Sequence, residues 1–252
     1  MERITKVVKH LIIINVIFFL ASQLNVIPNL NLSNLMALYY FENPKFQWWQ
    51  CVSHMFMHGG FMHLFFNMYA LWAFGGPLEK IWGQNKFLFF YFSCGIGAAL
   101  LHSAINYYYF QEGVNALQNN GIEPETIKNV LAQGKYNTYW EEVIPRSKFT
   151  DMMSAYFTPV VGASGAIYGI LVAFAMMFPD AKLMMIFIPY PIKAKYFIPI
   201  LVGLDLFSGV TGFSVFGGNI AHFAHVGGAL IGFVMMWYWK KGTFNNNRWD
   251  RM

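Results

Sequence analysis

Charged residues are scarce in this sequence. Only 12% of its 252 residues are Asp, Glu, Lys or Arg, roughly half the share found in a typical soluble domain. Hydrophobic residues make up 56% and aromatic residues 19%. A soluble chain of this length needs more charge to cover its surface, so the composition indicates a protein embedded in lipid and excludes a disordered chain.

Cysteine is scarce as well. Cys51 and Cys94 are the only two, which is too few for a disulfide framework. The sequence also has no internal repeat, no low-complexity tract and no H-E-x-x-H metal-binding motif. We therefore expect one compact helical unit, without a cofactor or a bound metal.

Long apolar segments dominate what is present. A spanning helix needs about 20 mostly apolar residues, and helices satisfy their own backbone hydrogen bonds in lipid. We therefore predict an all-α membrane protein with a six-transmembrane-helix bundle, in a single domain of residues 1–252. The predicted spans are residues 11–27, 61–78, 87–110, 160–178, 197–216 and 220–239.

Basic residues predict the orientation of these spans. Most of the 17 Lys and Arg residues lie at the two termini and in the connections on the same side, which the positive-inside rule places in the cytoplasm. Basic residues precede the first span as in a signal peptide, but no small-x-small cleavage site follows it. We expect an uncleaved integral membrane protein in a bacterial cytoplasmic membrane, with a cytoplasmic tail at 240–252.

One long connection separates the third and fourth predicted spans. Residues 111–159 carry six acidic residues and form the only sizeable water-exposed segment. A connection of this length rarely lacks secondary structure of its own. Pro124 followed by Glu125 predicts that a short helix begins there.

Four polar side chains fall at one depth within three of the spans. Counting about 1.5 Å per residue from the cytoplasmic span ends puts these side chains roughly 18 to 24 Å up, nearer the outer side. Polar groups in lipid are costly and are functional candidates by default. The four residues are Ser164, His225, His63 and Asn67.

These residue types suit nucleophilic catalysis. A serine hydroxyl needs a base to take its proton, and imidazole is the usual base. An amide, a second imidazole and backbone N–H groups can stabilise the resulting oxyanion. Asp205 is the only acid inside a predicted span; we expect it to cap backbone near the outer end of its helix. A Ser–His dyad without a carboxylate is therefore the simpler mechanism.

Small residues predict how Ser164 and His225 meet. Gly228 and Gly232 lie on the same helix face as His225, and such small-xxx-small pairs allow close helix packing in lipid. This spacing favours His225 over His222 as the base. Tyr168, one turn from Ser164, is placed to stack on the imidazole.

The chain resembles the rhomboid family of intramembrane serine proteases, over roughly residues 48–239. The segment 111–159 is the least typical part, and Trp49-Gln50 replaces the family's Trp-Arg. Four motifs carry the resemblance: Gly162-Ala163-Ser164-Gly165, Ala224-His225-Val226-Gly227-Gly228, the His-xxx-Asn of His63 and Asn67, and the upstream histidines His54 and His58.

The resemblance implies the roles of the residues. Ser164 would be the nucleophile, His225 the base, and His63 and Asn67 the oxyanion donors. His54 and His58 would form structural hydrogen bonds near the first loop. The implied reaction is hydrolysis of peptide bonds in single-span membrane proteins within the lipid bilayer, at a site open to the outer side. No nucleic-acid partner is expected.

Other interpretations of the same residues stay open from sequence alone. Ser164 and Asn67 are also typical of helix–helix contacts. His54, His58 and His63 are compatible with zinc, the first two at i, i+4 spacing. A catalytically silent relative that binds membrane clients would keep the same fold. A transporter using the polar layer is less favoured, because the two halves show no repeat.

Overall fold

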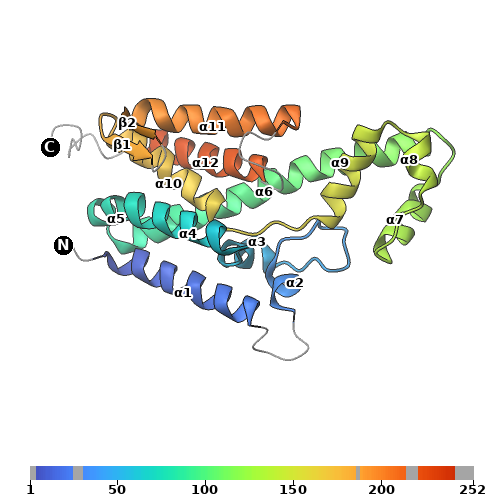
Figure 1. The fold of residues 1–252 in the computed structure, drawn as a ribbon, viewed down its shortest axis with the longest axis horizontal. Coiled ribbons are helices and arrows are strands. Elements are labelled where there is room, and N and C mark those ends of the chain that lie inside the picture. Colours follow the sequence, from blue (N-terminus) through green and yellow to red (C-terminus); the bar gives the residue numbers. More distant parts are fainter. Residues whose placement is uncertain (1–3, 25–30, 186–187, 214–220, 242–252) are drawn as a thin grey trace.

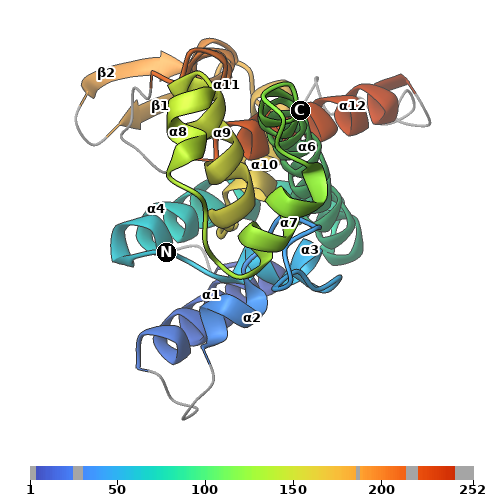
Figure 2. The same ribbon diagram turned by 90° about the vertical axis from the view of Figure 1, so that its right-hand side faces the viewer.

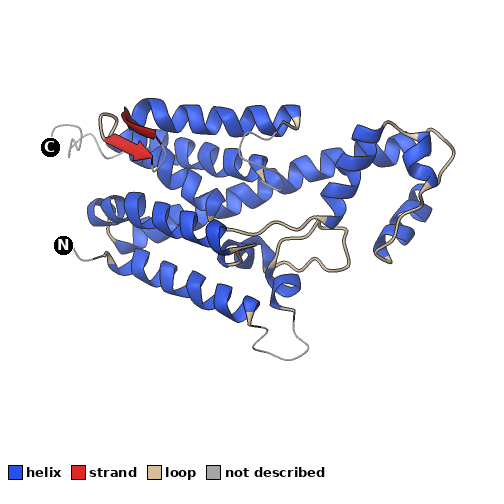
Figure 3. Ribbon diagram, in the orientation of Figure 1, coloured by secondary structure: helices blue, strands red, loops and turns tan. Residues whose placement is uncertain are grey.

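The computed structural model describes residues 4–24, 31–185, 188–213 and 221–241 (Figure 1). Helices form most of the regular structure (Figure 3). Within the described residues, three helices are long and apolar enough to cross a membrane: α1 (Lys6–Gln23), α6 (Gln84–Gln118) and α11 (Ala194–Thr211). Most of the predicted tail, 242–252, lies outside the described residues, as do 25–27 of the first predicted span and parts of the last two.

Helix α1 is fastened to the bundle at its N-terminal end. The carboxylate of Glu79 accepts hydrogen bonds from the Val7 and Val8 N–H groups, each at 2.9 Å. Glu79 is only 4% exposed, and a negative charge at a helix N-terminus is favourable because it meets unpaired N–H groups. This contact joins the first helix to the end of the second predicted span.

The second predicted span is three helical segments in continuous succession. α4 (Phe61–Ala70) passes into a π-helical segment η2 (Leu71–Gly75) and then into α5 (Gly76–Trp82). Pro77 follows the π segment, and a proline inside a helix lacks the N–H that would bond back along the chain. The wider π turn lies where this regular ladder is interrupted.

Helix α6 is longer than a membrane crossing requires. Its 35 residues correspond to about 52 Å at about 1.5 Å per residue, whereas the hydrocarbon core is about 30 Å thick. The helix continues eight residues past the predicted span end at residue 110, so it includes the first part of segment 111–159. The rest forms α7 (Pro124–Ala132), α8 (Tyr139–Val143) and α9 (Arg146–Phe157), with α7 starting at the proline as predicted.

The segment after α6 has its own core, at one end of the molecule (Figures 1 and 2). Trp140 is 2% exposed, and Phe110, Leu117, Ile127 and Leu131 are buried around it. Tyr40 of the first loop belongs to the same cluster. This apolar centre gives the segment a defined shape against the first loop.

The first loop is built from short helices pinned to the rest of the chain. It contains α2 (Leu32–Met36), α3 (Gln50–Ser53) and the 3-10 turn η1 (His54–Phe56). Leu38 and Val160 exchange backbone hydrogen bonds at 2.9 Å in an isolated bridge. Asn43 Nδ2 donates to the Tyr156 carbonyl at 3.0 Å. The loop and the approach to Ser164 therefore hold each other in place.

Three helices complete the bundle: α10 (Ser164–Met177), α11 and α12 (His222–Lys241). α10 is shorter than the predicted span 160–178, because residues up to 163 are extended or looped. Between α10 and α11 lies an antiparallel hairpin of β1 (Lys182–Met185) and β2 (Ile188–Lys193). This hairpin is a departure from the all-α expectation.

Candidate active site

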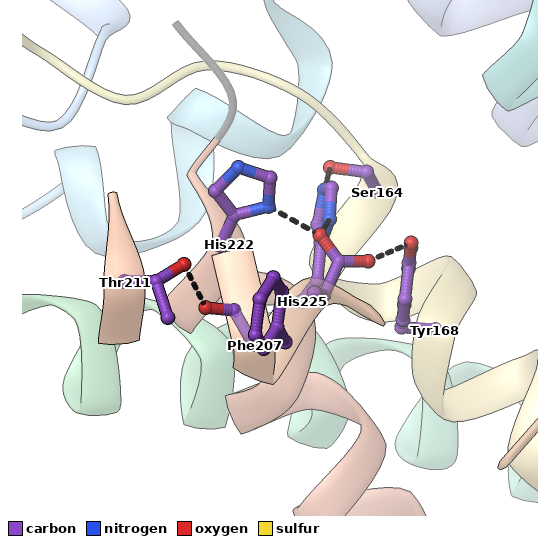
Figure 4. A network of polar contacts seen from close by, with 7 residues as sticks. Ser164, Tyr168, Phe207, Thr211, His222 and His225 are labelled. Carbon is purple, nitrogen blue, oxygen red and sulfur yellow. Dashed lines mark hydrogen bonds and ion pairs between the residues drawn. The ribbon is translucent and has the colours of Figure 1, made fainter. Parts of the chain in front are cut away.

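Ser164 and His225 meet across two helices. Ser164 is the first residue of α10 and His225 lies in the first turns of α12. The Ser164 Oγ and His225 Nε2 atoms are 2.8 Å apart, a hydrogen-bond distance, although 61 residues separate them in sequence (Figure 4). The His225 side chain is 13% exposed, so the pair is sheltered but reachable.

Glycine permits the approach that brings these residues together. A Cβ added at Gly228 would lie 1.8 Å from the Gly165 carbonyl oxygen, and one at Gly232 would lie 2.7 Å from Gly169 Cα. No larger residue fits at these two positions without moving the helix backbones apart. The small-residue pairs singled out in the sequence thus form the crossing of α10 and α12.

Tyr168 packs against one face of the His225 imidazole. Its ring stacks on the His225 ring with centroids 4.2 Å apart and planes 11° apart. Its hydroxyl donates a hydrogen bond to the Asp205 carboxylate. The stack limits rotation of His225, and the hydroxyl ties α10 to α11.

Asp205 lies in the site, contrary to the sequence-based prediction. We expected it to cap backbone near the outer end of its helix and expected the polar layer to lack a carboxylate. Instead its Oδ1 is 3.2 Å from His225 Nδ1 and 2.5 Å from His222 Nδ1, and the residue is 1% exposed. One feature of the sequence could have indicated this placement: Asp205 is the only acid within a predicted span, and it lies near the middle of residues 197–216.

The two neighbouring histidines have different partners. His225 contacts both Ser164 and Asp205, one through each ring nitrogen. His222 is hydrogen-bonded to Asp205 through Nδ1. Figure 4 shows its ring beside His225. Of the two, His225 is therefore the one positioned to take a proton from Ser164.

His63, on α4, lies against Gly162. Gly162, just before Ser164, has a φ of +125°, and a Cβ there would lie 2.8 Å from the His63 Nε2 atom. Glycine is thus needed both for the backbone conformation and for the contact with the ring. Asn67 is 6% exposed, and its Nδ2 donates to the His63 carbonyl one turn earlier, at 2.8 Å.

The first-loop histidines lie beside this group. The Gly162 N–H donates to the His54 carbonyl oxygen at 2.9 Å, and His54 Nδ1 is 2.8 Å from the Gln50 carbonyl. The His58 ring packs edge-on against His63 with centroids 5.0 Å apart. Among the described residues, no group of three or more potential ligands has a geometry that would hold a metal ion.

The fold and these contacts define a helical membrane protein with a serine–histidine pair at a helix crossing. The family model of the rhomboid domain matches residues 45–116 and 138–242. The chain therefore belongs to the rhomboid family. The match leaves out residues 117–137, which include α7.

Individual relatives agree with this assignment. The chain is 28% identical over 194 residues to rhomboid protease AarA of Providencia stuartii, covering 73% of this chain and 53% of that protein. It is 26% identical over 211 residues to the human presenilin-associated rhomboid-like protein, mitochondrial, covering 82% and 42%. Rhomboid protein 1, mitochondrial, of Saccharomyces cerevisiae is 25% identical over 192 residues, covering 76% and 42%. The chain thus spans about half or less of the length of these relatives.

These relatives contradict the predicted compartment. We expected a bacterial cytoplasmic membrane, with both termini in the cytoplasm, from the distribution of basic residues. The human and yeast relatives are named as mitochondrial and match 82% and 76% of the chain, against 73% for the bacterial protease. A positive-inside pattern indicates orientation relative to the membrane and does not identify the organelle.

Proposed function

We propose that this protein is an intramembrane serine endopeptidase that uses Ser164 and His225. The observation that carries the proposal is the 2.8 Å contact between Ser164 Oγ and His225 Nε2, in a chain of the rhomboid family. One of its relatives is named as a protease. The mitochondrial names of two others favour a mitochondrial membrane as its place of action.

The proposed domain is a six-helix bundle in the bilayer. Its spans are α1, the continuous α4–η2–α5, α6, α10, α11 and α12. α10, with 14 residues, is too short to span alone at about 1.5 Å per residue. Its first residue, Ser164, therefore lies below the membrane surface, on the side where segment 111–159 projects. The single domain covers residues 1–252, with its core at about 48–239.

The proposed chemistry is acyl transfer. His225 Nε2 takes the proton as Ser164 Oγ attacks the peptide carbonyl carbon, which forms the Oγ–C bond. The same proton passes to the leaving amine nitrogen as the C–N bond breaks. Water then attacks the Ser164 ester, with His225 acting as base again, and releases the new carboxyl terminus.

The oxyanion of the tetrahedral intermediate needs hydrogen-bond donors. Ser164 begins α10, and the first N–H groups of a helix have no intrahelical acceptor, so its own N–H is one donor. His63, packed against Gly162, is the second. Asn67 is the third; it lies one turn along α4 from His63, with one amide proton on the His63 carbonyl. Such donors typically contribute about 10²–10³-fold each to the rate.

The proposed substrates are single-span membrane proteins. A peptide bond within a helix is shielded by its own hydrogen bonds, so the substrate must unwind locally to reach Ser164. Small or helix-breaking residues near the end of the substrate span favour this unwinding. Water can reach the site because Ser164 and His225 are both partly exposed.

A reagent that needs no substrate tests the proposal. A fluorophosphonate probe phosphonylates an activated serine: the serine oxygen bonds to phosphorus, fluoride leaves, and the base takes the proton. We expect labelling of the purified protein to map to the peptide containing Ser164 and to disappear in Ser164→Ala and His225→Ala. Labelling that persists in Ser164→Ala, or none in the native protein, would contradict the proposed function.

A further inference from the structure

Asp205 presents one carboxylate to three hydrogen-bond donors. Oδ1 accepts from the ring nitrogens of His222 and His225, and Oδ2 accepts from the Tyr168 hydroxyl. These donors come from α12 and α10, whereas Asp205 belongs to α11. An acid in a membrane-spanning segment is costly unless its partners compensate it, and this one is 1% exposed.

The arrangement determines which nitrogen of His225 carries the proton. An ionised carboxylate can only accept hydrogen bonds, so His225 Nδ1 must be the donor in that contact. In a neutral imidazole, Nε2 then carries the lone pair. Nε2 is the atom 2.8 Å from Ser164 Oγ, so the tautomer selected by Asp205 is the one able to accept the serine proton.

We propose that Asp205 is a positioning residue, which orients His225 as the general base and makes the site a Ser–His–Asp arrangement completed from α11. This inference rests on the proposed function. The carboxylate fixes the imidazole tautomer and stabilises the imidazolium that forms when the serine proton is transferred. It acts through His225 and touches neither the substrate nor Ser164.

A consequence for the architecture follows. Ser164 and His225 are held together by the glycine crossing of α10 and α12, whereas the residue that sets the tautomer comes from α11. The base is therefore fully oriented only when α11 lies against both helices. Tyr168 supports the same placement, because it contacts Asp205 with its hydroxyl and His225 with its ring.

The test compares Asp205→Asn, which keeps the side-chain shape and removes the charge, with Asp205→Glu, which keeps the carboxylate. The matched control is Ser208→Ala, a change on the same helix at a residue that is also 1% exposed and whose hydroxyl lacks a partner. For each purified variant, kcat and KM on a single-span reporter, the fluorophosphonate labelling rate of Ser164 and the thermal unfolding midpoint are measured.

We expect Asp205→Asn to lower kcat and the labelling rate by about 100-fold or more, since loss of the corresponding charge in a soluble serine protease costs about 10⁴-fold. KM should stay within about threefold, because Asp205 does not contact substrate. Asp205→Glu should recover part of the loss in kcat, and Ser208→Ala should match the native protein.

Three results would overturn the inference. The first is that kcat and the labelling rate are unchanged in Asp205→Asn, and the second is that they fall only in proportion to the protein that fails to fold. The third is that kcat falls equally in Asp205→Asn and Asp205→Glu. Absence of Ser164 labelling in the native protein would instead overturn the proposed function itself. The two failures are therefore distinguishable.

Discussion

The imidazole of His225 lies flat against the phenol ring of Tyr168, with centroids 4.2 Å apart and planes 11° apart. The same tyrosine donates its hydroxyl proton to Asp205. One side chain thus restrains the proposed base in two ways, through the ring face and through the carboxylate bonded to its Nδ1.

Two substitutions separate these contributions. Tyr168→Phe keeps the stack and removes a hydrogen bond to a charged group, a loss worth about 1.5–3 kcal/mol in proteins. If about half of this is felt in the transition state, kcat falls by roughly four- to thirteen-fold. Tyr168→Ala also removes the stack and should cost more. Equal kcat values for the two variants would show that the stack contributes nothing.

The helix crossing gives a second prediction. Gly228→Ala places a Cβ 1.8 Å from the Gly165 carbonyl oxygen, so α10 and α12 must separate and Ser164 must move away from His225. We expect at least a 100-fold loss of reporter cleavage, because small displacements of catalytic groups have effects of about this size.

Gly203→Ala is the matched control for Gly228→Ala. A Cβ at Gly203 on α11 meets nothing within 4 Å, and alanine in a helix interior is favoured over glycine by about 0.5–1 kcal/mol. This variant should keep its activity and unfold at a slightly higher temperature. Similar activity losses in both glycine variants would argue against the crossing as the cause.

Much of this site was predictable from sequence because helix geometry is regular. A fixed rise per residue is enough to place Ser164, His225 and His63 at one depth, and the glycine spacing indicates which helix faces meet. The nearness of Ser164 to His225 in the fold agrees with that reasoning.

Asp205 was misplaced for a reason of the same kind. Rise along a helix gives the depth of a residue only if the helix ends are known, and the ends of α11 were uncertain. Depth also says nothing about rotation, so the direction in which Asp205 points could not be derived. The hairpin β1–β2 was missed because its strands are short and β2 contains two prolines, Pro189 and Pro191, which are typical of a loop in sequence.

A third prediction concerns the attachment of α1. Glu79→Gln replaces one carboxylate oxygen by an amide group that donates, and the N–H groups of Val7 and Val8 then face a single acceptor. Leaving a buried donor unsatisfied costs about 1–3 kcal/mol, so the thermal midpoint should fall. Glu112→Gln, in a surface ion pair with Lys148 at 2.9 Å, should cost less than about 1 kcal/mol. A midpoint unchanged by Glu79→Gln would contradict the proposed attachment.

The core of segment 111–159 gives a fourth prediction. Trp140 is 2% exposed and its neighbour Tyr139 is 52% exposed on the same short helix. Trp140→Ala should destabilise the segment by about 3–5 kcal/mol, whereas Tyr139→Ala should have little effect. Amide hydrogen exchange across α7 to α9 measures this difference directly. Equal exchange in the two variants would mean that the cluster around Trp140 does not stabilise the segment.

Cleavage of a single-span reporter by purified protein in detergent is the most direct test of the central claim. Ser164→Ala, His225→Ala and His222→Ala are compared with the native protein. We predict cleavage by the native protein, none in the first two variants and retained cleavage in His222→Ala, because of these two histidines it is His225 that is hydrogen-bonded to Ser164 Oγ. Cleavage that survives Ser164→Ala would contradict the serine mechanism. Cleavage lost in His222→Ala but kept in His225→Ala would show that His222, and not His225, is the base.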